Sequence, residues 1–424
     1  MCNHRCGPNC VRANSAVCLA AMNPELLDLI AKLEPQLAAS FLAAIRSMRE
    51  AINFPVLLAA LRDGDIDLAI YALDMNAAAF NGYVMERQAG YVQAGTVVAG
   101  MLTKDRAKAM RKLARETALT PPSSPSYAPL PSALPAPPVP PRQPPTIPGS
   151  AIPGGGKIVF SFEMTNPRAE ARIRTEAATR VAGYVEEQVE TARRVIGDGF
   201  QRGEGPQAIA TTIAGRINPV SKKREGGIVG LSDPQVTYVE SMRARLLSGD
   251  PDELMKVLGR FDKDGKWVEG TGMTLRDRRY DASIKKAIRE IAAGKPNPLT
   301  RDRVEEVAAK YSDRLLKKRA EDIARTETAS GVEMARAEAA KQALAKAGLP
   351  DDALTKTWVH QGGIRHARDW HLAANGKTVV GVDTPFILGD GSVMMYPHDP
   401  DGGAKNNVAC RCRGDQEVDW AFGL

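Results

Sequence analysis

Proline divides this sequence in two. Fourteen of its 29 prolines lie between Pro121 and Pro153, and Gly154, Gly155 and Gly156 follow directly. Proline fixes φ and removes an amide donor, so such a run favours extended polyproline II over helix or sheet. We therefore predict a linker over residues 119–156 and interpret it as a spacer rather than as a ligand for a proline-binding groove.

Helical periodicity marks the part of the chain before the linker. Its apolar residues recur at steps of three and four, which places them on one helix face. The series is Leu26, Ile30, Leu33, Leu37, Phe41, Ile45, Met48 and Ile52. A second helical stretch is expected from about Pro55 to Leu73. Residues 24–118 are thus predicted to form an all-helical docking domain, preceded by a Cys-rich tail over residues 1–23.

Helical patterns also dominate the middle of the chain. A short apolar run, Ile158 to Phe162, is expected to form a strand, and a long helix follows from about Arg168. Ser232 to Gln235 has the pattern of a capping box. Thr300 is expected to cap a helix whose pattern continues almost unbroken to Ala347. We predict a long helical domain over residues 157–348.

The last part of the chain has a different sequence pattern, in which short strand-like stretches alternate with turns rich in glycine and proline. Strands are expected at residues 355–359, 377–382 and 392–396. Residues 349–424 are predicted to form a small α+β domain, whose size is marginal for a core without extra support. The predicted fold class is therefore mainly α, with a small α+β domain at the C-terminal end.

Composition excludes several classes of protein. No stretch approaches the roughly 18 apolar residues of a membrane helix, and no secretory signal pattern is present, so we expect a protein made in the cytosol without a membrane partner. Six cysteines in 424 residues do not support a fold built on disulfides. A phosphate-binding loop and the cytidine-deaminase pattern are also absent from the sequence.

The chain carries a net charge of +7, and the surplus lies in its middle. Residues 157–350 contain 36 basic and 29 acidic residues. The basic clusters are Lys222, Lys223 and Arg224, and then Arg276, Arg278 and Arg279. Contact with double-stranded DNA is one interpretation, and a solvated helix face with internal ion pairs is the other. Arg325 and Glu327 are expected either to dock their helix onto a partner or the last domain, or to be exposed helix charges.

Four of the five histidines lie in the last domain together with Cys410 and Cys412. They are His360, His366, His371 and His398. Imidazole and thiolate are preferred zinc ligands, and a small domain gains folding free energy from a bound metal. We expect His371, Cys410 and Cys412 to bind zinc, with His366 or His398 as the fourth ligand. The alternative is a cysteine that packs as a small apolar group, with histidines hydrogen-bonded in turns.

The N-terminal tail contains a second set of possible metal ligands. These are Cys2, His4, Cys6 and Cys10. Gly7-Pro8 disfavours the helix that would align the cysteines, and a tail with reduced thiols is the alternative interpretation.

A catalytic use of the last domain is an alternative hypothesis. A zinc ion with an open position and a carboxylate base would give a metal-dependent nuclease or another effector enzyme. The candidate bases are Asp369, Asp383, Asp399 and Asp401. No complete catalytic motif accompanies them, so we expect a protein without turnover.

Several segments of this sequence, taken in order, form a pattern that can be compared with known families. The helical middle contains TNPRAEARIRTEAATRV, IVGLSDPQVTYVESMRARLL and YSDRLLKKRAEDIARTETASGVEMARAEA. The end contains Trp358, Arg368-x-x-His371, Gly376, Pro397, Asp399-Pro400 and Cys410-Arg411-Cys412. This series resembles the Mu F-like minor head proteins of tailed phages, which act in head morphogenesis. That family usually has glycine where His398 stands and asparagine where Ala409 stands.

The resemblance implies a low-copy component of the virion head, assembled in the host cytoplasm. Its expected partners are the portal protein and the major capsid protein, with packaged DNA as a further contact. A scaffold that leaves before maturation would share the same sequence features.

Overall fold

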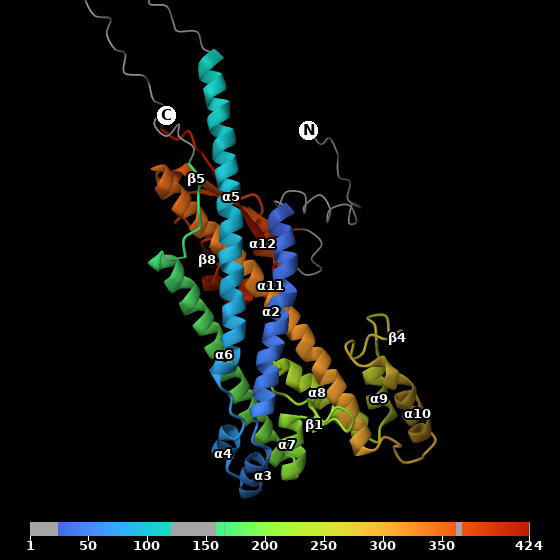
Figure 1. Cartoon of the computed structure of the whole chain (residues 1–424). Helices are drawn as coiled ribbons and strands as arrows, with labels where there is room; N and C mark the ends of the chain where they lie inside the picture. The colour runs from blue at the N-terminus through green and yellow to red at the C-terminus, as the bar shows by residue number, and fades with distance from the viewer. Residues whose placement is uncertain (1–23, 120–157, 165, 362–366, 424) are drawn as a thin grey trace, which may run out of the picture.

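The computed structural model describes residues 24–119, 158–164, 166–361 and 367–423 (Figure 1). The predicted Cys-rich tail and all but Leu119 of the predicted linker lie outside these residues. The described part of the chain is mainly α, with small antiparallel sheets and a compact α+β region at its C-terminal end. The predicted fold class is confirmed.

The N-terminal residues form helices where the periodicity predicts them. The elements are α2 (Pro24–Ala51), α3 (Phe54–Asp63), α4 (Ile66–Tyr71), the 3-10 helix η1 (Ala77–Phe80) and α5 (Asn81–Leu119). Asn53 and Asp65 cap α3 and α4 with their side-chain oxygens, which accept hydrogen bonds from the amides of Val56 and Leu68. The apolar face of α2, from Leu26 onward, is largely buried.

The middle of the chain is helical with two short hairpins. Its elements are α6 (Pro167–Gln201), α7 (Pro206–Ala214), β1 (Arg216–Ile217), β2 (Arg224–Glu225), α8 (Asp233–Leu247), α9 (Pro251–Leu258), β3 (Gly259–Phe261), β4 (Trp267–Glu269), η2 (Arg278–Tyr280), α10 (Asp281–Ala292) and α11 (Arg301–Ala347). Both predicted caps are confirmed. Thr300 Oγ1 accepts a hydrogen bond from the Arg303 amide at 3.3 Å, and the Ser232 amide donates to Gln235 Oε1 at 3.1 Å.

Helix α11 is the central element of the fold. Its 47 residues run the length of the molecule, and α2, α5 and α8 pack along it (Figure 1). One hydrophobic core extends from Leu37 in α2 to Ala324 in α11. Helices before and after the proline-rich segment thus share this core. The segment marks a change in composition, but it does not separate two hydrophobic cores. No helix among the described residues has the length and apolar character needed to cross a membrane.

The apolar run at residues 158–162 pairs with no strand in the described part of the chain, which corrects the prediction of a strand there. Its aromatic side chains pack between helices instead. Phe160 stacks on Trp420 with ring centroids 5.3 Å apart, and its amide donates to Thr103 Oγ1 of α5 at 2.9 Å. Phe162 lies edge-on to Tyr91 of α5. The run is apolar because it fills a groove between helices, a pattern that resembles that of a buried strand.

The C-terminal region is built around a three-stranded sheet. Its elements are η3 (Asp351–Ala353), β5 (Leu354–Val359), α12 (Asp369–Ala374), β6 (Thr378–Val380), β7 (Phe386–Ile387), β8 (Val393–Met394), η4 (Pro400–Gly402), α13 (Gly403–Asn407) and β9 (Arg413–Val418). The order is β6-β5-β9, with Leu354 opposite Val418 and Val359 opposite Arg413. Strand β9 was not predicted, because its sequence RGDQEV is almost entirely polar.

Buried polar groups brace this region. Lys356 of β5 donates from Nζ to the carbonyl oxygens of Val382, Thr384 and Met395 at 2.8, 2.7 and 3.1 Å. Burial lowers the pKa of this lysine to about 8. These bonds hold the loops beyond β6 and β8 against the central strand.

A candidate metal centre in the C-terminal region

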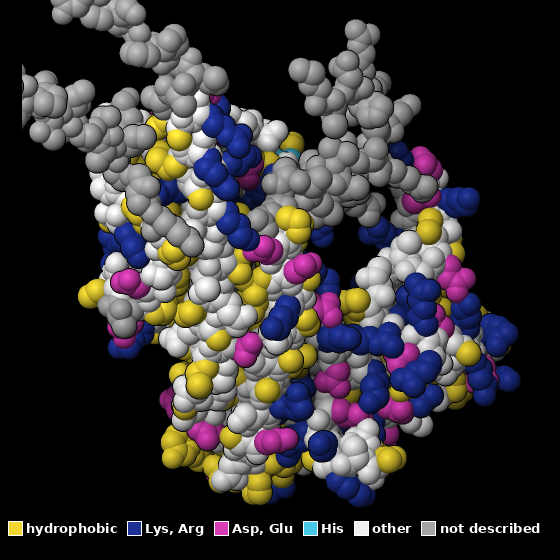
Figure 2. Space-filling model, turned by 45° about the horizontal axis from the view of Figure 1, so that its top comes forward, with side chains coloured by type: hydrophobic (Ala, Val, Ile, Leu, Met, Phe, Trp, Pro, Cys, Tyr) yellow, Lys and Arg dark blue, Asp and Glu magenta, His cyan; other side chains and the backbone are white. Residues whose placement is uncertain are grey.

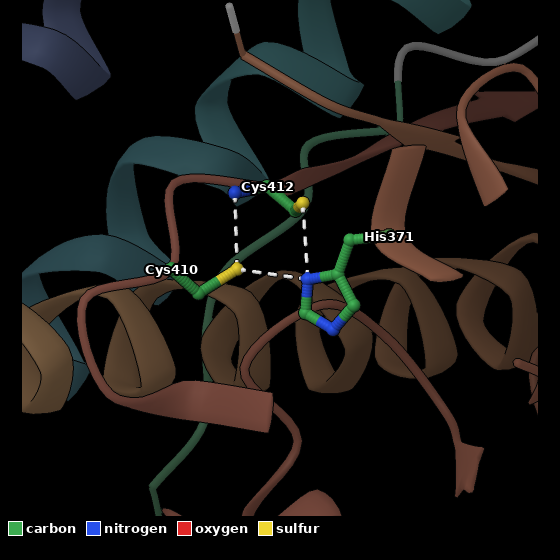
Figure 3. A group of neighbouring side chains, drawn as sticks. All are labelled: His371, Cys410 and Cys412. Atoms are coloured by element: carbon green, nitrogen blue, oxygen red, sulfur yellow. Dashed lines mark hydrogen bonds between the residues drawn. The ribbon is translucent and has the colours of Figure 1, made fainter. Parts of the chain in front are cut away.

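His371, Cys410 and Cys412 point toward one another in the interior of the C-terminal region (Figure 3). His371 Nδ1 lies 3.4 Å from Cys410 Sγ and 3.5 Å from Cys412 Sγ, and all three ligand atoms lie within 4.8 Å of one another. A tetrahedral zinc ion with ordinary Zn–N and Zn–S bond lengths separates N and S ligand atoms by about 3.5 Å. The three side chains are 2 to 5% exposed. They could therefore hold a metal ion, as the sequence predicts for these three residues.

Local backbone structure sets these positions. His371 lies in the first turn of α12, where its amide donates to the Arg368 carbonyl. The Arg368 side chain donates to the carbonyls of Lys405 and Val408 at 2.5 and 2.8 Å, which ties α12 to the segment that leads into the cysteines. The Cys412 amide donates to Cys410 Sγ at 3.3 Å. Both sulfur atoms therefore face the same imidazole, although the Cys-x-Cys pair precedes β9 rather than lying in a strand.

Asn406 fixes which nitrogen of His371 carries the proton. The Asn406 amide nitrogen donates to Ser392 Oγ and to the Gly402 carbonyl, which assigns its Oδ1 as an acceptor. That oxygen lies 3.0 Å from His371 Nε2 and also accepts from Trp370 Nε1 at 2.8 Å. His371 Nε2 must therefore be the protonated nitrogen. Its Nδ1 then presents a lone pair to the two sulfur atoms, which is the tautomer that a metal requires.

The two thiols share their protons unequally. A hydrogen bond from the Cys412 thiol, with a further contribution from His398, lowers the pKa of Cys410. The same hydrogen bond and burial raise the pKa of Cys412. The two shifts are opposite in direction, and a metal ion would bind both sulfur atoms as thiolates.

The other histidines of the cluster lie in three different settings. His366 falls outside the described residues. His398 is 2% exposed, its φ is 65°, and its Nδ1 has no hydrogen-bond partner in the described part of the chain. His360, at the end of β5, places Nδ1 3.5 Å from Cys412 Sγ. Sequence reasoning did not select His360 as a ligand, because its contact with Cys412 depends on the pairing of β5 with the unpredicted β9.

The second predicted metal cluster, Cys2, His4, Cys6 and Cys10, lies outside the described residues.

Of the six residues in the predicted basic clusters, Arg276 is buried, Arg224 is half-buried and the other four are exposed. Arg276 is 2% exposed and binds both carboxylate oxygens of Asp281 at 2.8 Å, so it is not on the surface as predicted. Arg279 pairs with Asp277, and Arg224 stacks over the Phe54 ring at 4.6 Å. Arg279 is exposed in spite of its pairing, as are Lys222, Lys223 and Arg278.

Glu327 belongs to a buried ion network, which corrects its interpretation as an exposed or partner-binding charge. It lies 2.9 Å from Arg87 Nε of α5 and 3.5 Å from Arg180 Nε of α6, and Glu176 of α6 lies 2.5 Å from Arg87 Nη2. The network joins α5, α6 and α11. Arg325 is half-exposed and lies 3.9 Å from Glu34 of α2. Sequence reasoning missed Arg87 and Glu176, because their partners are distant in sequence.

The hydrogen bond between Asn406 and His371 gives a first prediction. Asn406→Ala is expected to lower zinc affinity by about 10- to 100-fold, since the imidazole loses the acceptor that fixes its tautomer. Asn407→Ala is the matched control, because Asn407 is equally buried but donates to the Asp399 carbonyl instead. Competition with a chromophoric chelator measures both affinities. Equal losses in the two variants would contradict a specific effect through His371.

Comparison with family models, with curated proteins and with solved structures found no match to this chain.

Proposed function

We propose that this chain is a minor head protein of a tailed phage, of the Mu F-like kind, whose C-terminal region is stabilised by a structural zinc ion. In this role it associates with the portal protein and the major capsid protein during head assembly and resides in the virion head. The observation that carries the proposal is that the residues of the resemblance at the C-terminal end meet at one centre.

The contacts among those residues are direct. The Trp358 ring lies edge-on to the His371 ring with centroids 5.3 Å apart, and the Gly376 amide donates to the Trp358 carbonyl at 2.8 Å. Arg368 holds the segment before Cys410, and Asp399 accepts the Met395 amide at 2.7 Å. Residues spread over more than fifty positions thus serve one local structure. This supports a shared structural reason for the series rather than a chance resemblance.

The backbone at His398 and Ala409, the two positions that depart from the family pattern, also supports the proposal. His398 and Ala409 have φ values of 65° and 56°, in the left-handed region that glycine and asparagine adopt most readily. Those are the residues that the family usually has at these positions. The backbone here therefore supports the same local turns, with a less favourable residue at each.

The ligand chemistry favours zinc. Two sulfur atoms and an imidazole nitrogen are soft and borderline ligands, which suit zinc better than magnesium or calcium. Among the described histidines, His360 is a candidate for the fourth ligand, because its Nδ1 lies 3.5 Å from Cys412 Sγ. When bound, the ion would tie α12, the end of β5 and the segment before β9 together, and Asn406 would orient one of its ligands.

Burial of the three central ligands favours a structural ion over a catalytic one. A catalytic zinc keeps a position open for substrate, whereas His371, Cys410 and Cys412 are all at least 95% buried. Two of the four carboxylates proposed for a nuclease are engaged elsewhere. Asp399 accepts backbone amides, and Asp383 pairs with Lys341 of α11.

Quantitative mass spectrometry of purified particles and of portal-containing procapsids tests the role in the head. We expect a few copies of this chain per particle, counted against the portal and major capsid proteins. Absence from both kinds of particle, with abundant protein in the infected cell, would contradict the proposal and favour an effector enzyme. Presence in procapsids alone would instead indicate a scaffold.

A further inference from the structure

A row of cations follows one face of α5 in its C-terminal part. Between Lys104 and Glu116 the helix has six basic and two acidic residues. Five of the six recur at helical spacing and are exposed. They are Lys104, Lys108, Arg111, Lys112 and Arg115. At 100° per residue they fall within an arc of about 100°. We call these five residues the α5 stripe, and Figure 2 shows Lys and Arg side chains in a row along this part of the molecule.

Most of the charge of the α5 stripe is unpaired among the described residues. Lys104 lies 3.0 Å from Glu25, and Lys112 lies 3.8 Å from Glu116. Lys108 and Arg115 have no carboxylate partner there, and Arg111 donates to the Ala107 carbonyl of its own helix.

The helix macrodipole does not account for this pattern. Cations near a helix C-terminus are favourable, but the effect falls off within the last turn. Helix α5 ends at Leu119, so Lys104, Lys108 and Arg111 lie two to four turns before that end. A further reason is needed for their alignment.

Helix α5 is packed against the core directly before the α5 stripe begins. Val98, Ala99 and Leu102 of α5 pack against Ala339 and Ala343 of α11 in a separate hydrophobic cluster. The opposite face of the helix, which carries the stripe, is exposed. A cation row fixed to the core in this way keeps its spacing when a ligand binds, which lowers the entropic cost of binding.

We infer that the α5 stripe is a binding surface for the phosphate backbone of double-stranded DNA. From Lys104 to Arg115 the helix rises about 17 Å. A DNA strand presents one phosphate per about 3.4 Å of its axis, so the stripe faces about five phosphates. Five cations thus match about five anions. Such contacts neutralise phosphates without reading bases, and the binding is independent of sequence.

Binding of the full chain to a labelled duplex of about 30 base pairs tests this inference by fluorescence anisotropy over a series of salt concentrations. The test variant replaces Lys108, Arg111 and Arg115 with Gln. The control variant replaces Lys263, Lys266 and Lys295 with Gln, since these are exposed cations near α9 and α10, far from α5. Both variants lose the same charge, and Gln suits a helix.

We expect the test variant to bind about tenfold more weakly or worse, and its slope of log affinity against log salt to fall by about 3. The control variant should stay close to wild type. Equal weakening in both variants would overturn the inference, because net charge would then be the cause. Wild-type affinity in the test variant would also overturn it, as would tighter binding to polyglutamate than to DNA, which would point to an acidic protein. These outcomes do not depend on whether the chain is found in particles.

Discussion

Removal of zinc is expected to open the C-terminal region while the helical body stays folded. At free zinc about 1,000-fold above Kd, a bound ion stabilises the folded state by about 4 kcal/mol, and a chelator removes that contribution. Trp358, Phe386, Cys410 and Cys412 share one small hydrophobic cluster, which has few other apolar residues to hold it. We therefore expect faster hydrogen exchange at residues 367–418 after chelation, with little change in α2 and the first half of α11.

Cys410→Ser separates the effect of the metal from that of packing. The substitution costs some stability even without metal, because a buried apolar contact is lost. The informative quantity is therefore the difference in thermal stability with and without chelator. We expect a large difference in the wild-type protein and almost none in Cys410→Ser. Wild-type protein that purifies without zinc and is insensitive to chelator would contradict a structural metal.

The fourth ligand is tested by the same measurement. His360→Ala is expected to weaken zinc binding and reduce the effect of the chelator, because its Nδ1 is the additional histidine nitrogen closest to Cys412 Sγ. His398→Ala is the comparison, since His398 is buried and contributes to the lowered pKa of Cys410. A loss of metal affinity in His398→Ala alone would assign the fourth position to His398 instead.

Local signals in the sequence were sufficient for the helices. Helix caps and apolar helix faces depend on residues three or four positions apart, so they can be recognised in the sequence. The caps at Ser232 and Thr300 and the apolar face of α2 are examples. Strand β9 and the run at residues 158–162 could not be predicted in this way. Strand β9 is polar and is paired by its backbone, and the run at residues 158–162 alternates buried and exposed residues like a strand although it packs between helices.

The sequence was sufficient to predict which residue types form the candidate metal centre, but not how they are arranged. Clustering of histidine and cysteine near the C-terminal end indicates His371, Cys410 and Cys412, because few other residues bind zinc. The roles of His360 and Asn406 depend on the register of β5 with β9 and on the loop that carries α13. Likewise, the sequence does not show whether a basic residue is exposed or buried. Lys222 is exposed, whereas Arg276 is buried against Asp281.

Arg87→Met is expected to lower the free energy of unfolding by about 3 to 5 kcal/mol, since it leaves two buried carboxylates with Arg180 as their one nearby cation among the described residues. Arg87 and Glu327 are each 2% exposed in their side chains, at the junction of α5, α6 and α11. Burial alone would lower the pKa of Arg87, but Glu327 and Glu176 raise it, so its guanidinium is charged. Lys104→Met on the same helix is the control. Lys104 and Glu25 are 68% and 57% exposed, and the expected loss is at most about 1 kcal/mol.

The double variant Arg87→Met, Glu327→Met distinguishes loss of the ion pair from loss of packing. It removes one charge of each sign and leaves Glu176 beside Arg180, with 3.7 Å between Oε1 and Nε. The buried charge is then balanced again, and methionine fills the space of either side chain. We expect the double variant to be more stable than Arg87→Met alone, as measured by the midpoint of urea unfolding in the zinc-loaded protein. Additive losses would mean that the two side chains contribute by packing, and that the junction of the three helices does not depend on charge balance.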